Sequence, residues 1–132
     1  MEMSDRVKYW FDLSDEDLAV AQVLLEGNKN LYSGFMCHLA VEKALKAVIA
    51  KNCAEGEIPP KIHNLIKLAN KAGLYEKMTD EQMNLIDKLN PLNIEARYPE
   101  YKDEIAATMS KESWMKLIEE TEEILCWIKK QL

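Results

Sequence analysis

The sequence predicts an all-α protein, an up-and-down antiparallel helical bundle with three long and two short helices. The 132 residues include only four glycines and four prolines, which leaves little turn material and favours a few long elements. Apolar residues recur three and four positions apart over five segments, which is typical of helices with one buried side. No alternating, strand-like pattern extends beyond four residues. At this length we expect a single domain over residues 1–132.

The first long helix is predicted over residues 4–26. Ser4 can cap its start, and Gly27 can end it in a left-handed conformation. Its stripe of apolar side chains has one small polar member, Ser14. The apolar positions of the stripe are Val7, Phe11, Leu18, Ala21 and Leu25.

The second long helix is predicted over residues 31–51 and is apolar on most sides. Its polar strip is narrow and consists of Glu42, Lys43 and Lys46. A helix of this kind lies at the centre of a bundle or is covered by a second subunit. Residues 52–60 then form a connecting loop.

Two short helices follow. The first is predicted over residues 63–71, ended by Gly73, and the second over residues 79–89. Thr79 and Gln82 have the spacing of a capping box at the start of the second. Short connections between helices favour antiparallel neighbours.

An irregular segment, residues 90–107, separates these helices from a last long helix over residues 110–132. Ser110 can cap that helix. Tryptophans 10, 114 and 127 lie at apolar helical positions, so we interpret them as core or subunit-contact anchors.

The charge balance bears on the class of ligand. Lysine and arginine total 17 against 23 acidic residues, a net charge of −6. Proteins that coat nucleic acid nonspecifically carry a basic face, so this balance argues against that class. A local pocket for one nucleotide needs only one or two cations, so the net negative charge is compatible with such a pocket.

The chain has no apolar signal segment at its start and no run long enough to span a membrane. Its three cysteines, at positions 37, 53 and 126, lack metal-binding spacing, so we expect reduced thiols. These features predict a cytoplasmic protein with no membrane partner.

Two histidines are candidates for polar chemistry. His38 and Glu42 lie four residues apart on one face of the second long helix, which favours a hydrogen-bonded pair; Glu42 could instead pair with Lys43 or Lys46. Two ligands are too few for zinc, so we predict no metal site and no cofactor. His63 follows Lys61 at the head of a short helix, where it either contacts a ligand in a cleft or only packs there.

Arg97 and Tyr98 are the binding candidates of the irregular segment. Arginine offers a planar fork of donors that suits phosphate, and a tyrosine ring can stack on a base. The alternative is structural, with Arg97 paired to Glu95 or Glu100 and Tyr98 packed against the bundle.

Five motifs in order resemble the HEPN domain family over nearly the whole chain. The Ala-x-Glu-Lys-Ala-Leu-Lys pattern of its second helix is similar to residues 40–46 here, and its RYPD loop is similar to residues 97–100, with Glu100 in place of Asp. The remaining similarities are Trp10 with residues 17–19, the His-x-Leu-x-x-Leu run of residues 63–68, and residues 122–128.

The resemblance implies a dimeric helical bundle with a cleft for nucleotides or RNA, often paired with a minimal nucleotidyltransferase in toxin–antitoxin systems. The candidate nucleotide-binding residues are then His63, Arg97, Tyr98, Lys61, Glu42 and Lys46. Many toxin members of the family are metal-independent ribonucleases that carry a histidine four to six residues after an arginine.

That arginine–histidine spacing is absent here, because no histidine follows Arg6 within six residues or Arg97 at all. We therefore expect a non-catalytic homodimer that binds a nucleotide or a nucleotidyltransferase partner. One alternative is a metal-independent ribonuclease that combines Arg97 with His63, and another is a structural adaptor.

Overall fold

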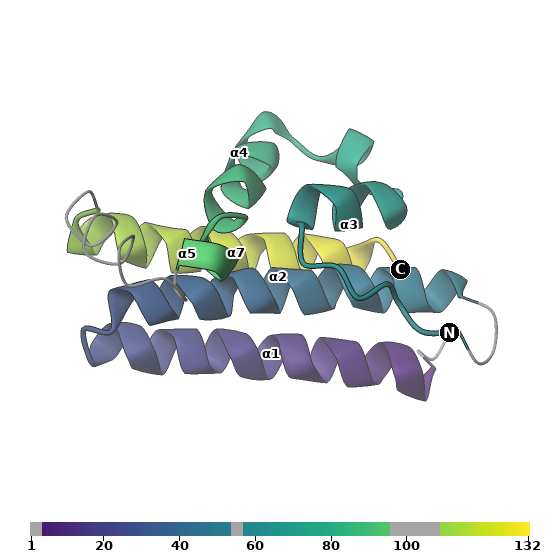
Figure 1. Ribbon diagram of the computed structural model, residues 1–132, viewed down its shortest axis with the longest axis horizontal. Helices are drawn as coiled ribbons and strands as arrows, with labels where there is room; N and C mark the ends of the chain where they lie inside the picture. The colour runs from purple at the N-terminus through teal and green to yellow at the C-terminus, as the bar shows by residue number, and fades with distance from the viewer. Residues whose placement is uncertain (1–3, 54–56, 96–108) are drawn as a thin grey trace.

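Three long helices lie side by side in the computed structural model, which describes residues 4–53, 57–95 and 109–132 (Figure 1). They are α1 (Asp5–Glu26), α2 (Asn30–Asn52) and α7 (Lys111–Lys130). The shorter elements pack across one side of this layer, and they are α3 (Leu65–Lys71), the 3₁₀ turn η1 (Tyr75–Lys77), α4 (Asp80–Leu89) and α5 (Leu92–Glu95). The described residues contain no strand, and the predicted all-α bundle is confirmed.

Helix α2 is the centre of the bundle. It contacts α1, α7, α3, α4 and α5, and fifteen of its residues are buried. The chain itself therefore covers the nearly all-round apolar surface that the sequence shows. The central position of α2 within one chain thus accounts for most of its apolar pattern.

Two serines explain how polar side chains fit between α1 and α2. The hydroxyl of Ser14 on α1 donates to the carbonyl of Ala40 at 2.7 Å, and that of Ser33 on α2 donates to the carbonyl of Ala21 at 2.7 Å. Both serines are buried. A short hydroxyl that bonds a backbone carbonyl is satisfied without leaving the interface, so Ser14 continues the apolar stripe.

The predicted left-handed end of α1 at Gly27 is wrong, because Gly27 has φ −85° and the next residue, Asn28, takes the left-handed conformation with φ 62°. The predicted N-terminal caps form as expected. Ser4 accepts from the N–H of Val7, Ser110 accepts from the N–H of Ser113, and Thr79 with Gln82 makes a reciprocal capping box. These contacts satisfy N–H groups that have no partner within the helix. They set where α1, α4 and α7 begin.

The first short helix starts two residues later than predicted. Asn64 is its N-cap, accepting from the N–H of Lys67 at 3.1 Å, while the N–H of Leu65 donates to the side chain of Asn90 at 2.9 Å. His63 is thus left in the segment of residues 57–64, which crosses α2 before it enters α3 (Figure 1).

Within the irregular stretch, α5 adds one helical turn that the sequence pattern did not predict. Leu92 at its start is buried, and one of its methyl groups lies close to Gly34 of α2. Packing against α2 thus stabilises a turn too short to be stable alone. The 3₁₀ turn η1 was likewise not predicted.

The three tryptophans differ in burial. Trp114 is fully enclosed, as expected of a core anchor, whereas Trp10 and Trp127 are only half-buried and pack at the edge of the core.

Among the described helices, none has the length and apolar character that a membrane span requires.

Candidate functional site

The carboxylate of Glu42 is the centre of a polar cluster on α2. Glu42 is only 4% exposed, and its two oxygens have different partners. Oε1 lies 3.0 Å from Nδ1 of His63, and Oε2 accepts from the ammonium of Lys46 at 3.1 Å. Lys46 follows Glu42 by one helical turn, so α2 alone places the two together.

His38 lies one turn before Glu42 on the same face and is fully buried. Its Nδ1 donates to the carbonyl of Leu89, at the end of α4, over 2.9 Å. Its Nε2 lies 3.3 Å from Oε1 of Glu42, which is within ion-pair distance. The geometry of that contact is poorer than that of the Nδ1 bond, and Nε2 has no other hydrogen-bond partner among the described residues.

These neighbours keep Glu42 ionised. Burial by itself raises the pKa of a carboxyl group, but the contacts with His38, His63 and Lys46 outweigh it and lower the pKa of Glu42 to about 2. At neutral pH the cluster therefore contains a permanent buried carboxylate next to a buried ammonium.

His63 is the member of the cluster that a ligand can reach. About half of its side chain is exposed, 52%, because it lies on the crossing segment. An ionised carboxylate only accepts hydrogen bonds, so Nδ1 of His63 is the donor in the contact with Glu42. The other ring nitrogen, Nε2, takes no part in that bond.

Aromatic rings of α1 border the cluster. The ammonium of Lys46 lies 5.8 Å from the centre of the Trp10 ring, and the Tyr9 ring meets Trp10 edge-on at 6.0 Å. Tyr9 is 59% exposed. The sequence assigns neither Trp10 nor Tyr9 to the site, because nothing local connects α1 with Lys46.

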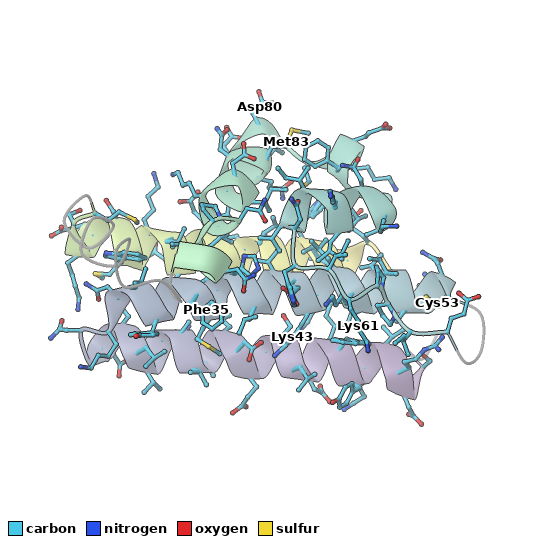
Figure 2. The ribbon with its side chains drawn as sticks, in the orientation of Figure 1. Phe35, Lys43, Cys53, Lys61, Asp80 and Met83 are labelled. Atoms are coloured by element: carbon cyan, nitrogen blue, oxygen red, sulfur yellow. The ribbon has the colours of Figure 1, made fainter. Side chains whose placement is uncertain are left out.

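Four predicted site residues lie in the part of the chain that the structure describes. It brings His63, Glu42 and Lys46 into one cluster. Lys61 is exposed on the same crossing segment and makes no hydrogen bond or ion pair with a described residue (Figure 2). The other two candidates, Arg97 and Tyr98, lie outside the described residues, so the predicted combination of Arg97 with His63 also falls outside them.

The structure also decides between the pairings that the sequence left open. Lys43 pairs with Asp17 of α1 at 2.7 Å and not with Glu42, because its side chain lies at the seam between α1 and α2. Glu42 contacts both His38 and Lys46, so the two pairings that the sequence offered as alternatives occur together. The Glu42–Lys46 pair is buried and not on the surface.

Other chemically notable groups lie apart from this cluster. No group of three His, Cys, Asp or Glu side chains among the described residues has the arrangement of a metal site. Cys37 is buried, and burial raises the pKa of its thiol to about 11, which makes it a poor nucleophile. An open hollow of about 480 Å³ follows α7 beside Cys126 and Trp127, and it includes no predicted site residue.

Comparisons with known proteins agree with the fold. The crystal structure of TT1696 from Thermus thermophilus superimposes with a TM-score of 0.78 at 18% sequence identity, covering 98% of this chain and 100% of that one. At that identity the likeness concerns the fold alone. No curated protein matches the chain. A family model described as the HEPN domain matches residues 7–131. The chain therefore belongs to the HEPN domain family.

Proposed function

We propose that this HEPN protein binds a nucleotide at the cluster formed by His63, Glu42 and Lys46, without catalysing a reaction, and that it acts with a minimal nucleotidyltransferase in a toxin–antitoxin-like pair. The observation that carries the nucleotide site is the half-exposed imidazole of His63, held by the ionised Glu42. The partner is suggested by the family resemblance.

The geometry suits a binding site because its polar groups are already oriented. Glu42 holds His63 through one oxygen and Lys46 through the other, so neither side chain must be ordered when a ligand arrives. Preorganised contacts cost less conformational entropy on binding. The Trp10 and Tyr9 rings offer apolar surface to the planar part of a nucleotide.

Calorimetry with a panel of ribonucleotides tests the nucleotide site. We expect His63→Ala to weaken the tightest-binding nucleotide by about tenfold, roughly the worth of one good hydrogen bond. Lys67→Ala is the matched control, because Lys67 is exposed on the neighbouring α3 and its side chain bonds no described residue. Binding that His63→Ala leaves unchanged would contradict the site, and silence across the whole panel would contradict nucleotide binding.

The partner and the oligomeric state have separate tests. A tagged version of this chain should copurify with a minimal nucleotidyltransferase encoded beside it, and a locus without such a gene would count against the pairing. Light scattering should give twice the mass of the 15.2 kDa chain if the predicted homodimer forms. A monomer would contradict that prediction and leave the nucleotide site standing.

One observation favours ribonuclease activity as a second candidate. Because Nδ1 of His63 donates to Glu42, the neutral ring keeps Nε2 as a proton acceptor, which a general base requires. Arg97 would supply the positive charge that stabilises the negative charge developing on the RNA during cleavage. Cleavage of RNA that His63→Ala and Arg97→Ala each abolish would support ribonuclease activity, whereas cleavage that survives His63→Ala would exclude this mechanism.

A third possibility is a structural adaptor. We would conclude that the protein is one if neither nucleotide binding nor RNA cleavage is found.

A further inference from the structure

We infer that Nε2 of His63 accepts a hydrogen bond from an O–H or N–H group on the nucleoside part of the ligand, and that this cluster does not hold the phosphate. The inference rests on the proposed nucleotide binding and specifies which part of the nucleotide the cluster recognises. Ribose hydroxyls and exocyclic amino groups are donors of the required kind.

The argument begins with the protons on His63. Its Nδ1 lies 3.0 Å from an oxygen of Glu42, a carboxylate that stays ionised at neutral pH and can only accept. Nδ1 must therefore carry a proton. A neutral imidazole has one donor and one acceptor nitrogen, so Nε2 is left with a lone pair. Such a nitrogen attracts a donor and repels a phosphate oxygen.

The charges around His63 point the same way. Lys46 already bonds Glu42, so the one ammonium in the cluster faces the one carboxylate. His38 lies behind Glu42, fully buried, with Nδ1 engaged by the carbonyl of Leu89. Lys61 is an exposed side chain on the same segment. The described cluster thus offers a phosphate no enclosed, uncompensated cation, whereas the adjacent Trp10 and Tyr9 rings suit a sugar or a base.

Two substitutions at position 63 separate an acceptor from a cation. His63→Gln keeps an acceptor oxygen on the side chain, whereas His63→Lys offers only donors and a positive charge. The probes are the four ribonucleosides, their 5′-monophosphates and inorganic phosphate, titrated at pH 8. Lys67→Ala again serves as the control.

We expect His63→Lys to weaken the best nucleoside and its monophosphate by the same factor, about tenfold, and His63→Gln to keep most of the affinity. Inorganic phosphate should not displace the nucleoside. The inference would be overturned if His63→Lys bound the monophosphate as tightly as the natural chain, or if inorganic phosphate competed. Absence of any nucleoside or nucleotide binding would overturn it together with the proposed function.

Nitrogen NMR provides an independent readout that needs no ligand. The chain has only two histidines, so a His38 variant assigns both rings. At pH 8, Nδ1 of His63 should be protonated and Nε2 bare, and Glu42→Gln should weaken that preference. A ring with its proton on Nε2 would overturn this inference while leaving nucleotide binding untouched.

Discussion

Nδ1 of His63 lies 3.0 Å from Oε1 of Glu42, although the two residues are 21 positions apart in the chain. This one contact fastens the segment that crosses α2 to the buried polar group of that helix. It fixes which nitrogen of His63 faces outward, and the stability of the cluster therefore bears directly on the proposed binding site.

Glu42→Gln tests the buried ion pair. The substitution keeps the shape of the side chain but leaves the ammonium of Lys46, 6% exposed, without its counter-charge. Removing one partner of a buried pair is costly, so we expect the free energy of unfolding to fall by about 2–4 kcal/mol. Urea denaturation followed by circular dichroism measures it.

The control is the pair formed by Lys8 and Asp12 on the surface of α1, which have the same four-residue spacing at 2.8 Å. Both side chains are largely exposed, so water and salt screen their attraction. Asp12→Asn should leave the urea midpoint unchanged. If Glu42→Gln behaved like Asp12→Asn, the Glu42 cluster would add nothing to stability.

Stability should fall in acid because of Glu42. Its pKa is lowered from the usual 4.5 to about 2 in the folded chain, so the folded state favours the ionised form. The stabilisation that ionised Glu42 gives the folded state is fully present above pH 4.5. It is lost as the pH falls toward 2, and the free energy of unfolding then decreases by about 3 kcal/mol. Urea midpoints between pH 7 and pH 2 should decline less steeply in Glu42→Gln than in the natural chain. Parallel declines would contradict the assignment to Glu42.

The two contacts of His38 can be removed one at a time. His38→Asn places an amide near the Nδ1 position, which can still bond the Leu89 carbonyl, while His38→Gln reaches toward Glu42 and leaves that carbonyl without its donor. Each should cost about 1–3 kcal/mol of unfolding free energy, because the site is fully buried. Only His38→Asn should alter the NMR signals of the His63 ring. Equal changes in both variants would mean that His38 acts through the fold as a whole.

Gly34 lies where α2 packs tightly against Leu92 of α5 and Trp114 of α7. A Cβ at this position would lie 2.7 Å from the Trp114 ring and 2.9 Å from a methyl of Leu92. Gly34→Ala should therefore destabilise the chain by about 1–3 kcal/mol through overpacking, measured as a lower urea midpoint. At Gly27 an added Cβ meets only backbone oxygens at 3.7 Å, so Gly27→Ala should have little effect. If Gly34→Ala were equally harmless, the packing between these helices would be looser than these distances indicate.

The sequence by itself determined the helices and part of the site. Contacts within three or four residues decide both, such as the capping box of Thr79 with Gln82 and the shared face of His38, Glu42 and Lys46 on α2. Helical geometry alone makes such pairs neighbours. The spacing of apolar residues indicated the order and approximate bounds of the long helices for the same reason.

Only the tertiary structure decided which groups meet across helices. The same α2 strip offered Lys43 and Lys46 as partners for Glu42, yet Lys43 forms an ion pair with Asp17 of α1, because the two side chains meet at the seam between α1 and α2. The contact of His38 with the Leu89 carbonyl joins residues 51 positions apart. Such pairings depend on how whole helices pack, a sum over many distant contacts that no local spacing encodes.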